Sequence, residues 1–137
     1  MGRETTQEKT MLKKLTPVLL VEEIEPCLPF WVERLGFQKT VEVPDGNKLG
    51  FVILAKDNIE IMYQSHASAE KDVPGLVQWP LKPATFLYIE VTDLDDIIQR
   101  LQGVPVAVPV RTTFYGAREI GVREPGGNVV AFAEFQR

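Results

Sequence analysis

The sequence predicts an α+β domain in which two repeated β-α-β-β-β modules form a curved mixed sheet around a groove. The first observation is that the pattern of strands and helix in residues 14–64 returns in the same order in residues 84–137. The second is that residues 65–83, which separate the two modules, contain three prolines and mixed polar residues, as a linker does. The third is that 137 residues with 45% hydrophobic side chains are enough for one ordinary core.

The first module is predicted element by element from its apolar pattern. Residues 16–21 (TPVLLV) form a short apolar run that indicates a buried strand. Apolar residues at helical spacing predict a helix over residues 22–35, and Gly36 ends it. Because proline is tolerated mainly in a first turn, Pro29 indicates that the regular helix begins near Cys27. Turn residues then separate three strands, which are expected at 37–43, 49–55 and 59–64.

The second module repeats this order with a helix about one turn shorter. Residues 85–91 (TFLYIEV) are predicted to form its first strand. Asp93 is a typical N-cap for a helix that runs to about Leu101, and Gly103 ends that helix. Three further strands are expected at 104–110, 116–123 and 128–135, the last two joined by a turn at 124–127.

The remaining segments are predicted to be irregular. Residues 1–13 are polar and are expected to form a flexible N-terminal tail. Residues 65–83 are expected to be a loop with one helical turn near residues 68–71. The prediction is therefore a tail followed by one domain over residues 14–137.

Charge and cysteine content exclude several classes of function. The formal net charge is −4, which disfavours a nucleic-acid partner because phosphates are bound by basic surfaces. The apolar runs are too short to span a bilayer, so no membrane association is expected. Cys27 is the single cysteine, which favours a reducing compartment, and the polar start lacks the apolar core of a secretory signal. These features predict a cytoplasmic protein.

The repeat itself points toward small-molecule binding. Each predicted module has one helix, and one helix covers only one face of a four-stranded sheet. The uncovered faces carry every second side chain of each strand. Because such a concave face lined by side chains is the usual form of a small-molecule site, we expect a ligand groove there.

Two motifs resemble those of a known family. Residues 30–37 (FWVERLGF) are similar to the helix-end signature of the vicinal oxygen chelate superfamily, which includes glyoxalases, bleomycin resistance proteins and extradiol dioxygenases. Residues 115–128 (YGAR followed by REPGGN) resemble its closing hairpin, where W-G-x-R and R-D-P-x-G-N are common. With residues 17–19 (PVL), the resemblance is closest to the bleomycin-resistance branch. It covers residues 15–135 and implies the glyoxalase/bleomycin-resistance fold and a homodimer with grooves at its interface.

The resemblance also implies where a metal ion would bind. In the superfamily's metalloenzymes, one His, Gln or Glu comes from the first and the last strand of each module. The matching positions here are Thr16, Glu60, Phe86 and Ala131. Only Glu60 is a good ligand, whereas a catalytic site takes about three protein donors. His66 is the single histidine and is expected to be a solvated loop residue. No metal site and no cofactor are predicted.

Strand alternation gives the groove an aromatic and partly acidic wall. On the penultimate strand the alternation leaves open whether Arg118 or Glu119 faces the groove, and apolar neighbours of Arg118 favour Glu119. Trp79 lies in a proline-bounded loop and is placed to form a lid or an interface contact. Each residue also has a structural interpretation, such as an ion pair for Glu60 or a core filler for Met62. The predicted ligand-binding residues are Glu60, Met62, Phe86, Tyr88, Glu90, Trp79, Tyr115 and Glu119.

Two classes of function follow from these expectations. The favoured one is a metal-independent binding protein that sequesters a small organic molecule, as the antibiotic-resistance branch of the family does. Carboxylates beside aromatic rings favour a cationic ligand. The alternative is a lyase, isomerase or dioxygenase-like enzyme of the same superfamily. In that case Glu60 acts as the base, with a pKa raised by burial, or belongs to a non-standard metal site.

Overall fold

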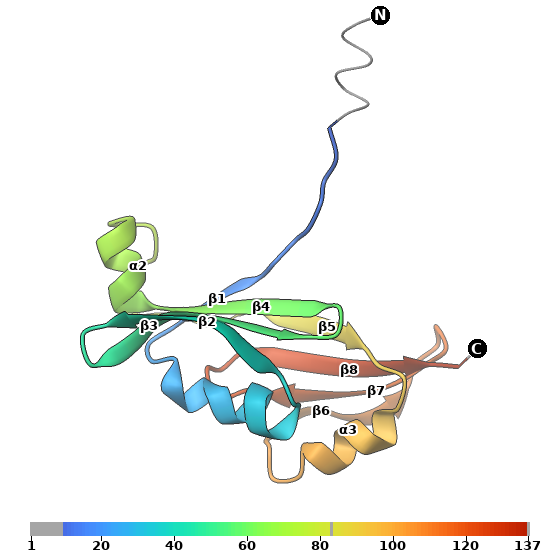
Figure 1. Cartoon of the computed structure of the whole chain (residues 1–137). Helices are drawn as coiled ribbons and strands as arrows, with labels where there is room; N and C mark the ends of the chain where they lie inside the picture. Colours follow the sequence, from blue (N-terminus) through green and yellow to red (C-terminus); the bar gives the residue numbers. More distant parts are fainter. Residues whose placement is uncertain (1–9, 83, 137) are drawn as a thin grey trace, which may run out of the picture.

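The strands form two four-stranded sheets, one from each module (Figure 1). A computed structural model describes residues 10–82 and 84–136 of the chain. The strand order is β1-β4-β3-β2 in the first sheet and β5-β8-β7-β6 in the second, so both sheets have the same topology. In each sheet the first and last strands of the module pair in parallel, and the other pairs are antiparallel. The two repeated β-α-β-β-β modules are therefore confirmed. Of the predicted tail, residues 1–9 lie outside the described residues.

The first sheet follows the predicted strands closely. Its strands are β1 (Val18–Val21), β2 (Gln38–Asp45), β3 (Lys48–Lys56) and β4 (Ile59–Ser65). The turn between β2 and β3 is shorter than expected, because Pro44 and Asp45 still pair with β3. Only Gly46 and Asn47 remain for the turn, and Gly46 adopts a φ of 68°, a conformation that a residue without a Cβ adopts without strain.

The segment between β1 and β2 is not one regular helix. A 3₁₀ turn, η1 (Glu25–Cys27), is followed by a π-helical segment, η2 (Pro29–Arg34). The prediction placed a helix over residues 22–35 with its regular part beginning near Cys27; helical turns do occupy this segment, but they form two pieces and neither is an α-helix. Pro26 and Pro29 both lack the N–H that continues a helix, and each stands in the first turn of its own segment.

The second sheet keeps the predicted order with small shifts at the strand ends. Its strands are β5 (Phe86–Glu90), β6 (Val106–Thr112), β7 (Ala117–Arg123) and β8 (Val129–Phe135). Between β5 and β6 lies the helix α3 (Leu94–Arg100). The Asp93 carboxylate accepts a hydrogen bond of 3.1 Å from the N–H of Asp96, which confirms the predicted N-cap.

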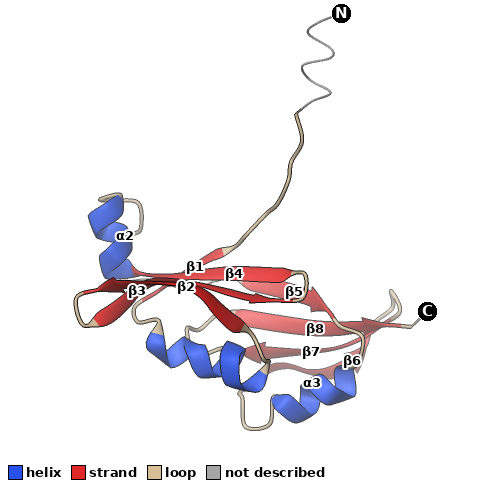
Figure 2. Ribbon diagram, viewed as in Figure 1, coloured by secondary structure: helices blue, strands red, loops and turns tan. Residues whose placement is uncertain are grey.

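The linker contains more helix than expected. The helix α2 (His66–Asp72) begins directly after β4 and stands at one end of the first sheet (Figure 2). Ser65 is its N-cap, and its hydroxyl accepts a hydrogen bond of 3.2 Å from the N–H of Ser68. His66 therefore opens a helix, whereas the sequence predicted a loop residue. No described helix has the length and apolar character needed to cross a membrane.

Both modules contribute to one buried core. Trp31 and Phe37, the two large aromatic residues of the FWVERLGF motif that follow Phe30, are buried in it, with 0% and 7% of their surfaces exposed. The Trp31 indole N–H donates to the Tyr63 hydroxyl at 2.9 Å, and that hydroxyl donates to the Glu124 carboxylate. Glu124 lies in the hairpin between β7 and β8, so this hydrogen-bonded chain joins the modules. Other core residues from the two modules include Leu19, Val52, Leu54, Leu94, Leu101, Val122, Val130 and Phe132.

Candidate functional site

The second sheet has an open face, on which Tyr88 of β5 and Glu119 of β7 lie. Residues opposite one another across paired strands share a face, and Tyr88 pairs with Ala131, which pairs with Gly121. Glu119 stands two residues before Gly121 and therefore lies on that same face. The Tyr88 hydroxyl donates a hydrogen bond of 2.6 Å to Oε2 of Glu119.

Two further side chains surround the Glu119 carboxylate. The Tyr115 hydroxyl lies 3.1 and 3.0 Å from its two oxygens. Arg111 donates from Nε at 3.1 Å and from Nη2 at 2.8 Å to Oε1. Glu119 as a whole is only 4% exposed, because these donors and the sheet enclose it. We call Tyr88, Arg111, Tyr115 and Glu119 the carboxylate cluster.

The electrostatics of the carboxylate cluster favour an ionised Glu119 and a neutral Tyr88. Burial opposes ionisation of Glu119, but hydrogen bonds from Tyr88, Arg111 and Tyr115 outweigh it and lower the pKa of the carboxyl. For Tyr88, burial and the hydrogen bond to Glu119 raise the pKa of the phenol well above its usual value. The cluster therefore offers two phenols and a guanidinium held by one central anion.

The open question about the penultimate strand is settled in favour of Glu119. Arg118 points to the opposite side of β7, where its Nη2 lies 2.6 Å from Oδ1 of Asp95 on α3. Tyr88 of the carboxylate cluster is 47% exposed, and Phe86, two residues before it on β5, is 59% exposed. Glu90, two residues after Tyr88, lies on the same face of β5. The open face of the second sheet is thus an exposed aromatic surface around a buried anion.

The open face of the first sheet carries Glu60 and Met62, both half-buried. Oε1 of Glu60 lies 2.7 Å from Nζ of Lys14 and 3.3 Å from the Thr16 hydroxyl. The hydrogen bond from Lys14 holds the pKa of Glu60 below its usual range. The expectation of a raised pKa at Glu60 is therefore wrong, because the ion pair stabilises the charged form more than partial burial opposes it.

Trp79 belongs to neither open-face group. Its ring packs at a tilt of 39° against His66 at the start of α2, with the two ring centroids 4.9 Å apart, and 55% of the residue is exposed. The predicted ligand-binding residues thus divide into three groups, around Glu119, around Glu60 and in the linker. Arg111, which completes the first group, is not among the predicted ligand-binding residues.

A family model matches residues 14–132, nearly the whole of this architecture. The chain belongs to the glyoxalase/bleomycin resistance protein/dioxygenase superfamily. This confirms the family suggested by the FWVERLGF and REPGGN motifs. The chain matches none of the curated proteins with which it was compared.

Solved structures of the superfamily share the fold. A glyoxalase/bleomycin resistance protein/dioxygenase from Nocardioides superposes with a TM-score of 0.70 at 16% identity, covering 99% of this chain and 93% of that one. A lactoylglutathione lyase from Agrobacterium tumefaciens gives 0.71 at 14% identity, with 92% and 96% covered. The bleomycin-binding protein of Streptomyces verticillus, solved with copper(II)-bleomycin, gives 0.60 at 27% identity, with 92% and 100% covered.

The residues at the superfamily's metal-binding positions do not fit a divalent metal ion. Phe86 and Ala131 offer only hydrocarbon, and the Glu60 carboxylate is held by Lys14 and Thr16. Within residues 10–82 and 84–136, no three His, Cys, Asp or Glu side chains are grouped to hold a metal ion. The donor set present at these positions therefore supports hydrogen bonding and aromatic contact instead of metal coordination.

Proposed function

We propose that this superfamily member binds a small organic molecule on the open faces of its sheets, without a metal ion and without turnover. The observation that carries the proposal is the carboxylate cluster, in which a buried anion fixes two half-exposed phenols beside the exposed ring of Phe86. Fixed aromatic side chains with a few oriented polar groups are what a small-molecule site requires. We also propose that the protein performs this role in the cytoplasm.

The charges of the site favour an aromatic ligand that carries no strong positive charge. Glu119 is neutralised by Arg111 and Glu60 by Lys14, with oxygen–nitrogen distances of 2.8 and 2.7 Å. A cationic ligand would have to displace these partners. In place of the cationic ligand that the sequence favoured, we therefore propose a flat organic molecule that stacks on Phe86 and Tyr88. The bleomycin bound by the Streptomyces verticillus relative supports a sequestering role of the antibiotic-resistance kind.

We further propose that a second copy of the chain completes the groove. The open faces expose large apolar side chains, namely Val41 and Val43 on the first sheet and Phe86 and Tyr88 on the second. Exposed apolar surfaces of this kind mark interaction sites. The expected solution state is a homodimer in which each open face supplies one wall, and sedimentation velocity of the wild type and of Phe86→Glu tests it. A wild type that sediments as a monomer contradicts this part.

A thermal-shift screen of aromatic natural products, with bleomycin and divalent metals included, tests the proposed function. An organic ligand is expected to raise the melting temperature of the protein purified in a chelator. Tyr88→Ala and Phe86→Ala are expected to weaken its binding about fivefold each, since stacking on an aromatic ring contributes about 1 kcal/mol. Val73→Ala, an exposed apolar control at the end of α2, should leave binding unchanged. Stabilisation by a stoichiometric metal alone would sink the proposal.

Glu60→Gln separates binding from catalysis. A general base with a lowered pKa is a weak proton acceptor, and Glu60 is ion-paired. We therefore expect the variant to keep ligand binding, with no turnover of the ligand in either protein by mass spectrometry. Turnover by the wild type that Glu60→Gln abolishes would establish the enzymatic alternative instead.

A further inference from the structure

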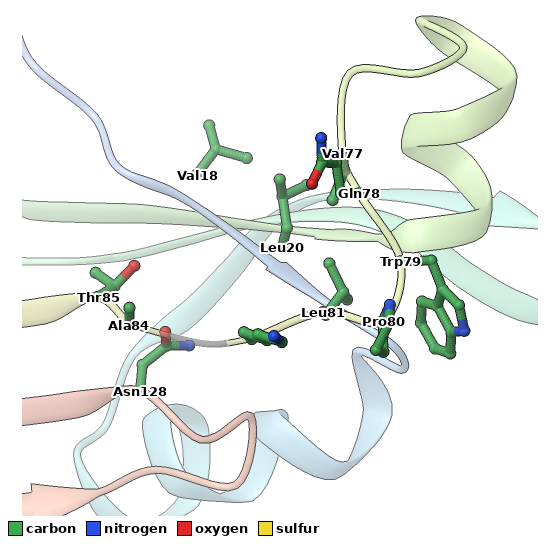
Figure 3. A pocket seen from close by; sticks show the side chains of 11 residues that line it. Val18, Leu20, Val77, Gln78, Trp79, Pro80, Leu81, Ala84, Thr85 and Asn128 are labelled. Carbon is green, nitrogen blue, oxygen red and sulfur yellow. The ribbon is translucent and has the colours of Figure 1, made fainter.

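A second pocket lies away from the carboxylate cluster, where the linker crosses β1 and reaches the second module (Figure 3). Its volume is about 450 Å³, within the size range of small-molecule sites. None of the residues of the carboxylate cluster lines it. The lining residues come from β1, the linker and the last hairpin, and they are Val18, Leu20, Val77, Gln78, Trp79, Pro80, Leu81, Lys82, Ala84, Thr85 and Asn128.

Asn128 supplies an unused hydrogen-bond donor to this pocket. The residue is 3% exposed, and within the described residues its Nδ2 has no hydrogen-bond partner. Its backbone is fixed, because its N–H donates to Glu124 Oε1 at 2.5 Å and its carbonyl accepts from the Glu124 N–H at 2.9 Å. The side-chain amide nitrogen is left unsatisfied, which is costly for a buried group and calls for an acceptor.

The amide is placed where a ligand can supply that acceptor. In Figure 3 it lies at the base of the pocket, with Ala84 and Thr85 above it and its nitrogen directed toward the linker that carries Leu81. A ligand reaches the NH₂ group after a half-turn of the terminal amide. This rotation exchanges the positions of the oxygen and the nitrogen and requires no movement of the backbone.

The rest of the lining defines the ligand. Lys82 is the one charged side chain among the described residues that line the pocket, in a chain of net charge −4. Leu20, Leu81 and Trp79 give the walls an apolar and aromatic character. We propose that this pocket is a second small-molecule site that takes a small organic carboxylate, whose oxygen accepts from Asn128 and pairs with Lys82. Its hydrocarbon body would contact Leu20, Leu81 and Trp79.

Trp79 provides a direct optical report on this pocket. It lines the pocket and is 55% exposed, whereas Trp31 is fully buried in the core. A ligand in the pocket therefore changes the emission of Trp79 and leaves that of Trp31 constant. A Trp79→Phe variant identifies which tryptophan gives the signal.

The test measures dissociation constants for phenylacetate and octanoate by titration calorimetry and by tryptophan emission. The neutral analogue 2-phenylethanol and inorganic phosphate serve as the two control probes. Both carboxylates are expected to bind, and phenylacetate about tenfold more tightly than 2-phenylethanol, because the alcohol lacks the charge. Asn128→Leu and Lys82→Gln should each weaken phenylacetate binding about tenfold. Lys39 lies on the distant strand β2, so Lys39→Gln should have no effect. Phe86→Ala should leave phenylacetate binding intact while it weakens binding of the open-face ligand.

Several outcomes would overturn the proposal. They are absence of carboxylate binding at millimolar concentration, equal binding of phenylacetate and 2-phenylethanol, phosphate binding as tight as that of the carboxylates, or unchanged binding in Lys82→Gln. If Asn128→Leu fails to fold, Lys82→Gln and Trp79→Ala, both at exposed positions, carry the test. Loss of binding in Phe86→Ala would assign the carboxylate to the open face of the second sheet and reject a separate site.

Discussion

Arg34 and Arg100 end the equivalent helical segments of the two modules, and each guanidinium donates to the main-chain carbonyl of the other residue. The Arg34 Nη1 lies 3.1 Å from the Arg100 carbonyl oxygen, and the Arg100 Nη1 lies 3.4 Å from that of Arg34. Arg34 also reaches the carbonyl of Gln102 at 2.6 Å. The last carbonyls of both segments, which have no partner within their own helix, are satisfied across the pseudo-symmetric contact.

The two arginines are expected to contribute additively to stability. Arg34→Met and Arg100→Met each remove only their own donor, since the backbone carbonyl of the substituted residue remains available to the other. We expect Arg34→Met to lower the free energy of unfolding by about 1 kcal/mol, and Arg100→Met by less because its bond is longer. Urea unfolding of the single and double variants measures this. A coupling between them well above about 0.5 kcal/mol would show that the side chains act as one unit.

Tyr63→Phe tests the chain of hydrogen bonds that joins the modules. The substitution removes the hydroxyl that accepts from Trp31 and donates to the buried Glu124. Because both partners stay buried, a loss of about 1–3 kcal/mol in unfolding free energy is expected from thermal or urea melts. Tyr115→Phe is the matched control, since it also removes a Tyr–Glu hydrogen bond, but at a half-exposed side chain, and should cost less. Equal losses would show that burial of the Tyr63 side chain is not decisive, since Glu119 and Glu124 are both buried.

Acid should destabilise the protein partly through Glu119. Its pKa is lowered in the folded state, so its contribution is fully present above the unfolded pKa of about 4.3 and is lost as the pH falls through the folded pKa. The unfolded chain binds the proton first, and stability therefore falls from about pH 5 downward. Urea midpoints between pH 7 and pH 3 should fall less steeply for Glu119→Gln than for the wild type. Parallel curves would contradict the assignment.

Cys27 should be unreactive while the protein is folded. It is 1% exposed, and burial, followed by the nearby Glu124 charge, raises the pKa of its thiol to about 12. The thiolate is the reactive form, so Ellman's reagent at pH 8 should modify the native protein only at the rate of unfolding. Modification within seconds in the absence of denaturant would show that η1 opens locally.

Most of the fold was predictable, because strand alternation and turn residues are local signals. Eight strands were expected and occur in the expected order. The difference lies at Pro26 and Pro29, where a regular helix was expected to begin near Cys27 and the missing backbone donors instead divide the segment into η1 and η2. Ser65 is a typical N-cap residue and was a local signal for the early start of α2 at His66. The polar composition of the linker nevertheless favoured the prediction of a loop.

The site was predictable only where the side chains lie on regular strands. Alternation placed Tyr88 on the open face but left Arg118 and Glu119 as alternatives; the apolar neighbours of Arg118 favoured Glu119, which lies on that face in the structure. It could not place Arg111, because the pairing of β6 with β7 shifts register between Val108 and Arg111. Two features depend on how the linker crosses β1: the unpartnered amide nitrogen of Asn128 and the contact between the Trp79 and His66 rings. Residue spacing carries no signal for either.

The bond between Tyr63 and Glu124 spans 61 positions of the chain. When only the first module has been synthesised, Glu124 is not yet present, so the Tyr63 hydroxyl lacks its acceptor. Contacts over such separations form slowly, and the nascent half leaves an aromatic surface open to chaperones or to a neighbouring chain in the meantime. Although the protein is built from a repeat, the first module therefore gains its full set of buried contacts only when the second module has folded against it.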